Sequence, residues 1–151
     1  MTELIIPQNK WDEVMSFIGE RIVETAIKKA PSDLGELRRS IQYNIQGNVL
    51  TISCDVPYAE HLEWNKGPMP NVDENVIRDW VRRHNKYKEN PAAVKRIMNQ
   101  LTTKGIAVGT VEKPLHITSW GRNSYRPFLR VGVHQVLTNE LGYIIQETLS
   151  K

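Results

Sequence analysis

The side chains in this sequence that could do chemistry are its four histidines and a few acidic and basic residues between positions 55 and 66. His61 and Glu63 have the spacing of one half of a deaminase zinc site, but the Pro-Cys-x-x-Cys half is absent. No two histidines are separated by the short intervals that are typical of a zinc site. The histidines therefore predict neither a metal ion nor a cofactor.

A second candidate is a Mg²⁺-dependent nuclease site formed by Asp55, Glu63 and Lys66. Such a site needs two or three acidic residues around the ion, and here the spacing is loose and a loop rich in glycine and proline follows. The sequence also lacks a glycine-rich phosphate loop and a Gly-x-Ser-x-Gly turn. Its one cysteine, Cys54, lies in an apolar run that is typical of a buried side chain. We therefore expect no enzymatic activity and keep the nuclease as an alternative.

Basic residues are concentrated in one segment of the chain. The whole chain has 20 basic and 17 acidic residues, a net charge of +3, whereas residues 78–104 include eight basic and two acidic residues. Such a segment can contact nucleic acid or an acidic protein surface, or it can be a solvated helix face. No zinc-finger or helix-turn-helix signature indicates sequence-specific recognition. The candidate DNA-facing or partner-facing residues are Arg78, Arg82, Arg83, Lys86, Lys88, Lys95 and Arg96.

The first secondary-structure element that the sequence predicts is a helix over 9–30. Its apolar stripe recurs at helical spacing, Asn9 is expected to cap its start, and Pro31 is expected to end it. Three apolar residues fall off this stripe, which indicates a second buried face against another element or another subunit; they are Phe17, Val23 and Ile27.

Two alternating apolar and polar runs, 41–46 and 50–56, are joined by Gly47-Asn48 and predict a β-hairpin. Residues 57–71 are expected to form a loop, followed by helices over 72–87 and from Pro91 to a cap at Gly105. Residues 106–120 predict a strand or an arm. The last helix is predicted over 127–149, with an apolar stripe that includes Leu137 and is interrupted by Glu140.

Together these elements predict an α+β fold in a single domain, 1–151, with a helical insertion and arm at about 70–120. We expect the long N- and C-terminal helices to pack on a small curved antiparallel sheet that contains the hairpin. No apolar run approaches the roughly 20 residues of a membrane helix, and no signal peptide is recognisable, so we expect a protein made in the cytoplasm without a membrane partner.

Three blocks, in this order, resemble the small head–tail joining, neck or tail-completion proteins of long-tailed double-stranded DNA bacteriophages. The first block, 30–41, follows the long helix; the second, 56–64, follows the hairpin; the third, 126–130, opens the last helix. Their sequences are APSDLGELRRSI, VPYAEHLEW and RPFLR. The resemblance implies fold-defining roles for Pro31, Gly35, Tyr58, Glu63, Arg126, Pro127 and Phe128.

The chain departs from the usual family pattern in places. Leu34-Gly35 replaces a common Thr-Gly, Trp64 and Asn65 follow Glu63 where an aromatic residue and a glycine are common, and Gly132-Val133 replaces a common alanine. The segment at about 70–120 is also longer than in compact members. These departures leave the subtype open among neck, tail terminator, tail completion and minor tail proteins.

The resemblance implies a structural virion protein at the head–tail junction or tail end. It implies a ring, hexameric in the assembled particle, that contacts neighbouring connector and tail proteins and lets DNA pass with at most non-specific contact. Large apolar groups off the main stripe or in loops are typical of interfaces, so the candidate subunit or partner contacts are Phe17, Ile27, Trp64, Met69, Trp120 and Tyr125.

Overall fold

The fold was analysed in a computed structural model that describes residues 5–31, 35–56, 59–64, 66–84, 90–117 and 124–151. Helices and short antiparallel strands follow one another along the chain, which confirms the α+β class. In chain order the elements are α1 (Gln8–Lys29), α2 (Glu36–Ser40), β1 (Ile41–Gln46), β2 (Val49–Cys54), α3 (Ala59–Glu63), α4 (Glu74–His84), α5 (Pro91–Thr103), β3 (Leu115–Ile117), β4 (Ser124–Arg126), α6 (Leu129–Asn139) and α7 (Leu141–Leu149).

The chain divides into two compact units. The first comprises residues 1–56 and 128–151, and the second comprises residues 57–127. The insertion expected at about 70–120 therefore falls within the second unit, which also takes in the segments on either side of it. The expectation of one domain stays a prediction.

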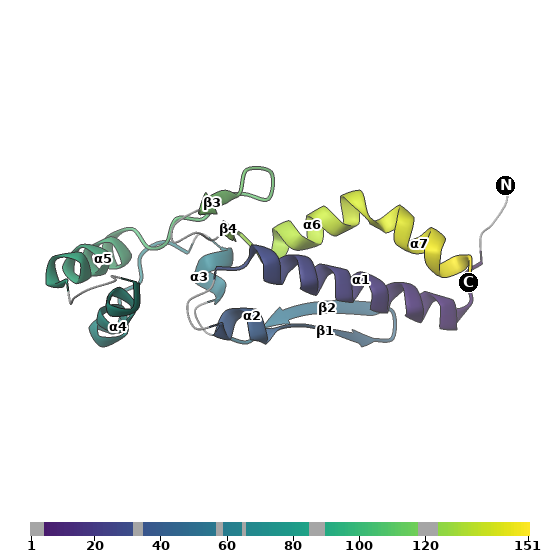
Figure 1. Ribbon diagram of the computed structural model, residues 1–151, viewed down its shortest axis with the longest axis horizontal. Helices are drawn as coiled ribbons and strands as arrows, with labels where there is room; N and C mark the ends of the chain where they lie inside the picture. The colour runs from purple at the N-terminus through teal and green to yellow at the C-terminus, as the bar shows by residue number, and fades with distance from the viewer. Residues whose placement is uncertain (1–4, 32–34, 57–58, 65, 85–89, 118–123) are drawn as a thin grey trace. The chain divides into compact units, whose positions relative to one another are not determined.

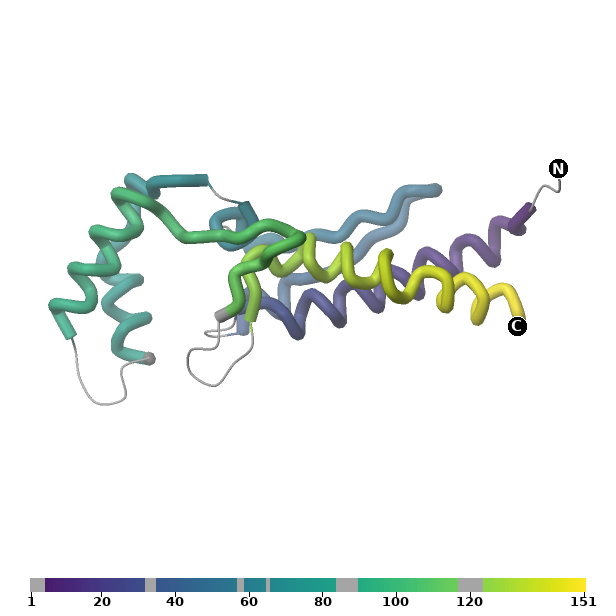
Figure 2. Tube along the Cα trace, turned by 90° about the horizontal axis from the view of Figure 1, so that it is seen from above, coloured from purple at the N-terminus to yellow at the C-terminus, as the bar shows by residue number. Residues whose placement is uncertain are grey.

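In the first unit, α1 is the middle layer (Figures 1 and 2). The β1–β2 hairpin packs on one side of α1, and α6 and α7 run antiparallel to it along another side. The predicted hairpin is confirmed, with Ile41 opposite Cys54 and Gln46 opposite Val49, and Gly47 in the turn has φ of 59°. The C-terminal helices thus pack mainly on α1. They share with α1 and the hairpin one apolar core.

That core is centred on the predicted stripe of α1. Its five buried members come from α1, α6 and α7: Val14, Ile18, Ile22, Val136 and Ile144. Leu50 and Ile52 of β2 pack against the same cluster from the hairpin side. Because two layers cover α1, the buried part of its surface is wider than one stripe, and the off-stripe residues Val23 and Ile27 are half-buried.

The C-terminal helix departs from the prediction, because it is two helices and not one. Glu140, between α6 and α7, has φ of −120° and ψ of −16°, which interrupts the helical geometry. Leu137, expected in the apolar stripe, is 44% exposed, whereas its neighbour Val136 is fully buried. Successive residues on a helix are turned by about 100°, so only one of these two neighbours can face α1.

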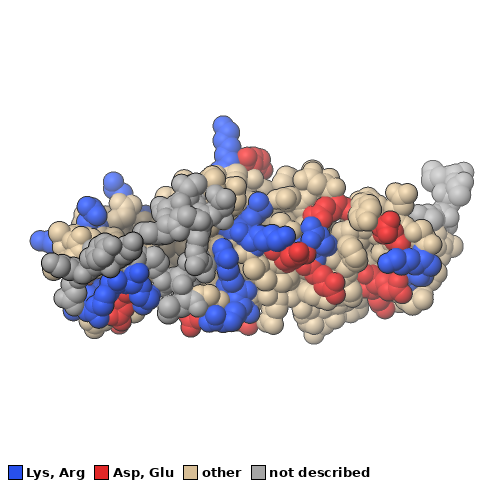
Figure 3. All heavy atoms as spheres, in the orientation of Figure 1, with Lys and Arg blue, Asp and Glu red and all other residues tan. Residues whose placement is uncertain are grey.

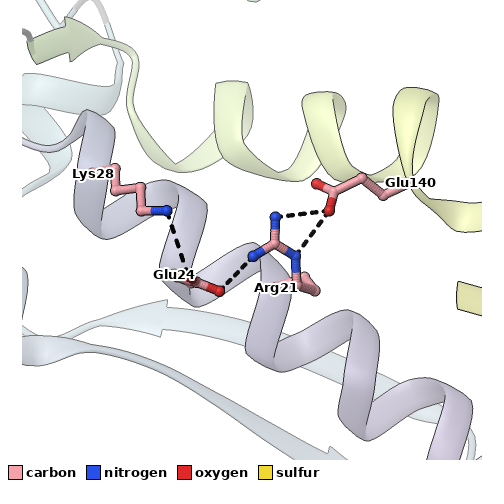
Figure 4. A network of polar contacts seen from close by, with 4 residues as sticks. All are labelled: Arg21, Glu24, Lys28 and Glu140. Atoms are coloured by element: carbon pink, nitrogen blue, oxygen red, sulfur yellow. Dashed lines mark hydrogen bonds and ion pairs between the residues drawn. The ribbon is translucent and has the colours of Figure 1, made fainter.

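The break at Glu140 coincides with a polar contact to α1. Arg21 donates from Nε (2.8 Å) and Nη2 (2.7 Å) to one carboxylate oxygen of Glu140, and it also pairs with Glu24, which pairs with Lys28 (Figure 4). The hydrogen bond to Glu140 raises the pKa of Arg21, and the hydrogen bond from Arg21 lowers the pKa of Glu24. Glu140, the one acid in the apolar stripe of the C-terminal helices, therefore helps to set how these helices are aligned along α1.

Three smaller expectations also need correction. Asn9 does not cap α1, because the helix begins one residue earlier and Pro7 occupies the cap position without a side-chain hydrogen bond. The expected loop at 57–71 contains the short helix α3. The strand or arm expected at 106–120 contains β3, which pairs with β4 in a second two-stranded antiparallel sheet.

In the second unit, α4 and α5 form a helix pair, as the sequence predicts. The side chain of Asn90 accepts a hydrogen bond from the backbone N–H of Ala93 (3.1 Å) and so caps the start of α5. Gly105, with φ of 81°, follows α5, and its N–H donates to the carbonyl of Gln100. Among the helices described, none is long and apolar enough to cross a membrane.

Gly19 provides a test of the contact between α1 and the hairpin. A Cβ at this position would lie 2.6 Å and 2.7 Å from ring carbons of Tyr43. Alanine favours a helix by about 1 kcal/mol over glycine, but overpacking costs roughly 1–3 kcal/mol. We expect Gly19→Ala to lower the free energy of unfolding, measured by urea titration with circular dichroism.

The matched control is Gly142 in α7, where a Cβ would meet nothing within 4 Å. Gly142→Ala should raise the free energy of unfolding by about 0.4–1 kcal/mol, because only the flexibility of the unfolded chain changes. Equal effects of the two substitutions would contradict the close packing of α1 on Tyr43.

Candidate functional site

The three residues of the alternative nuclease site do not form a defined cluster. Asp55 lies in the first unit, exposed, and accepts a hydrogen bond from Gln42 (3.3 Å). Glu63 is buried in α3 of the second unit, at 6% exposure. Lys66 pairs with Glu60, and this hydrogen bond lowers the pKa of Glu60. In the described part of the chain, no group of three or more metal-binding side chains is present.

The described histidines lie on separate elements. His61 is half-buried in α3, His134 is exposed in α6, and His84 ends α4. His116 of β3 stacks on Tyr125 of β4, with ring centroids 4.6 Å apart and planes 11° apart. This cross-strand stack explains one histidine as part of the second sheet, and it gives Tyr125 an intramolecular partner.

The first motif block forms the joint between α1 and the hairpin. Arg38 of α2 donates from Nε (3.1 Å) and Nη2 (2.8 Å) to the carbonyl oxygen of Ala30, the C-cap residue that follows α1. Ala30 has extended backbone geometry, as expected before Pro31. Gly35, the N-cap residue of α2, has φ of 81°. The guanidinium group of Arg38 thus donates hydrogen bonds to a backbone carbonyl at the end of α1, where no donor from the helix itself is available.

The same block also contacts the hairpin. Ser40 Oγ lies 2.8 Å from the carbonyl oxygen of Leu37 and 2.9 Å from Sγ of Cys54. Cys54 is half-buried, and Leu37 and Ile41 are 2% and 5% exposed. The lone cysteine is therefore packed as part of this joint. Ser32, Asp33 and Leu34 of the block lie outside the described residues.

The third block connects the second sheet to α6. Pro127 and Phe128 are buried, with Phe128 only 1% exposed. Arg126 Nη1 donates to the carbonyl of Ala107 (3.3 Å), while the buried Nε has no acceptor among the described residues. Burial lowers the pKa of Arg126. In the second block, Glu63 is buried as noted above, and Tyr58 lies outside the described residues.

The expected interface residues differ in exposure. Phe17 in the first unit is 38% exposed and Trp64 in the second unit is 50% exposed. Ile27, Met69 and Tyr125 are half-buried, and Trp120 lies outside the described residues. Sequence reasoning missed other large exposed apolar side chains, namely Val76 (59%), Tyr143 (62%) and the Leu137 noted above.

The basic segment forms a groove along the α4–α5 pair. Its volume is about 540 Å³, and its lining residues are Glu74, Arg78, Arg82, Asn90, Pro91, Val94, Lys95 and Met98. Lysine and arginine side chains gather over these helices (Figure 3). The lining includes the buried Val94 together with Pro91 and Met98, so the groove combines cations with apolar side chains.

The cations of the segment are not equivalent. Arg78 pairs with Glu74 (3.0 Å) and Arg82 pairs with Asp79 (3.5 Å), each within α4. Lys95 and Arg96 are exposed on α5 and form no ion pair with any described residue. Of these two, only Lys95 lines the groove. Arg83 is exposed on α4, and Lys86 and Lys88 lie outside the described residues.

Comparisons of the chain with protein-family models, with curated proteins and with solved structures found no match. The family resemblance therefore depends on the three motif blocks and on where they lie in the fold.

Arg38 provides a test of the first joint. A hydrogen bond to a charged group contributes roughly 1.5–3 kcal/mol, so Arg38→Ala should lower the free energy of unfolding by about that amount. Arg96→Ala is the control: its side chain is exposed and forms no ion pair with any described residue, and the change should be within about 0.5 kcal/mol. Guanidinium titration followed by tryptophan fluorescence measures both. A loss at Arg96 as large as that at Arg38 would contradict the proposed joint.

Proposed function

We propose that the chain is a structural protein of a tailed bacteriophage particle, located at the head–tail junction or tail end, where it forms a ring that joins or completes the tail. The observation that carries the proposal is the placement of the three motif blocks at joints of the fold. Block one links α1 to the hairpin, block two follows the hairpin, and block three leads into α6.

The contacts at these joints support structural roles for the motif residues. Arg38 fixes the end of α1, Leu37 and Ile41 are buried beside it, and Phe128 is buried at the start of the C-terminal helices. Such roles explain why these residue types occur together without any catalytic requirement. They support a scaffold whose function lies in its surfaces and not in an enclosed reaction centre.

The proposal includes a ring because exposed apolar groups occur on both units. Phe17 belongs to the first unit and Trp64 to the second. When a contact joins two different patches of identical subunits, it closes into a ring if its rotation divides a full turn, and otherwise it forms a filament. The number six comes from the family resemblance. DNA would pass through such a ring with phosphate contacts alone, without sequence readout.

The nuclease remains the less supported alternative. Its lysine is engaged by Glu60, and its two acids belong to different units. Absence of enzymatic activity and of a cofactor stays a prediction.

Imaging of phage particles that carry a tagged copy tests the proposed function. We expect a label on the tag to appear at the head–tail junction or on the tail of purified particles. The tag belongs at the N-terminus, because α1 begins only at Gln8 and Ile5 is 80% exposed. The matched control carries the same tag on the major capsid protein and should label the shell. Label spread over the shell, or absent from mature particles, would refute the proposal.

A further inference from the structure

The groove between α4 and α5 has the chemistry of a site for an acidic protein segment that also presents an apolar side chain. Lys95 lines the groove, is exposed and forms no ion pair with any described residue. Pro91, Val94 and Met98 provide an apolar surface beside it. An occupant that matches both features needs a carboxylate next to a large apolar group.

DNA matches this groove less well than a protein does. A phosphate backbone would leave the apolar part of the lining, Pro91, Val94 and Met98, without a partner. Arg78 and Arg82 already have acidic partners on α4, so they add less attraction for phosphate than two unpaired cations would. A protein segment with mixed apolar and acidic groups uses the whole lining.

The chain itself carries such a segment on the outer side of α1. Glu13, Phe17, Glu20 and Glu24 follow one another at intervals of three and four residues, which places them on one face of the helix. Phe17 is 38% exposed at the centre of this face. Glu13 pairs with Lys10, and Glu24 pairs with Arg21 and Lys28. Glu20 is exposed and forms no ion pair with any described residue.

We infer that the Phe17 face of α1, defined by these four residues, occupies the α4–α5 groove of a second copy of this chain. Phe17 covers the apolar part of the lining, and Glu20 lies beside Lys95. The inference rests on the proposed ring and names the surfaces that build it. Each copy has one face in its first unit and one groove in its second unit, so the contact is head-to-tail and can continue from copy to copy.

A charge exchange tests this contact in the 151-residue chain. Sedimentation equilibrium at about 0.15 M salt, where the Debye length is about 8 Å, measures the association constant. Protein concentrations up to about 1 mM cover contacts of micromolar to millimolar strength. Lys95→Glu and Glu20→Lys should each weaken self-association by about tenfold or more, because like charges then oppose each other. The double variant, which combines Glu20→Lys with Lys95→Glu, restores opposite charges and should regain most of the association.

Two controls make the same charge changes away from the contact. The first control is Arg96→Glu, because Arg96 is next to Lys95 on α5 but outside the groove lining. The second is Glu147→Lys, because Glu147 is exposed on α7. Both should leave the association constant within about twofold of the original, since charges outside the contact have small effects. Circular dichroism of every variant checks that the helices are retained.

Several outcomes would overturn the inference. Wild-type protein that stays monomeric at every concentration would do so, as would equal losses from Lys95→Glu and Arg96→Glu, or a double variant that is as weak as the single ones. DNA is the occupant instead if Lys95→Glu weakens binding to two unrelated duplexes while Glu20→Lys changes nothing. A negative result here with the label still at the head–tail junction refutes the contact but not the proposed function. Association as expected with label on the capsid shell refutes the function but not the contact.

Discussion

The burial of α1 from two sides is the constraint on which the first unit depends. The hairpin covers one side of the helix, and the C-terminal helices cover another. The fit is close on both sides: Gly19 leaves room for the ring of Tyr43, and a Cβ at Gly132 would lie 3.1–3.2 Å from atoms of Ala26. Because the C-terminal helices contact α1 over most of its length, the two ends of the chain must meet before this core is complete.

Polar contacts then set the register of this arrangement. Arg21 binds Glu140 near the middle of α1, and Lys10 Nζ donates to the carbonyl of Lys151 (3.1 Å) near its start. Ion pairs of half-exposed groups contribute little stability, commonly below 1 kcal/mol, so the apolar core supplies most of the energy and these pairs select one alignment. Arg38 performs the corresponding task at the other end of α1.

The second unit is built differently. The buried apolar side chains of its described helices are few and small: Ala59, Leu62, Val81 and Val94. A unit with such a small core gains less from its own packing, and Val76 on α4 is 59% exposed. Surfaces of this kind are suited to being covered by a neighbour, which agrees with a groove whose lining is both basic and apolar. In the proposed assembly, the first unit provides the Phe17 face of α1 and the second provides the groove that binds it.

The sequence predicts the elements whose signals are local. The period of α1, the alternation of the hairpin around Gly47, and the start of α5 at Pro91 all depend on neighbouring residues, and all are confirmed. The break at Glu140 was not predictable in this way, because its partner Arg21 is 119 residues away in the chain.

The candidate site likewise has a part that is predictable from local sequence and a part that depends on tertiary packing. The basic segment is visible in the sequence, but the groove depends on how α4 packs against α5, and the pairing of Arg78 and Arg82 with acids on α4 separates them from Lys95. Phe17 was identified because it lies off the apolar stripe. Its exposure could be established only once the positions of α6 and α7 were known, since these helices decide which side of α1 is covered.

The most direct measurement of the central claim is a cryo-electron microscopy reconstruction of the neck and tail from purified particles. We expect a closed ring of this chain in which the Phe17 face of each copy lies in the α4–α5 groove of the next. A ring in which α1 faces solvent and the groove is empty, or particles without the chain at either location, would contradict it.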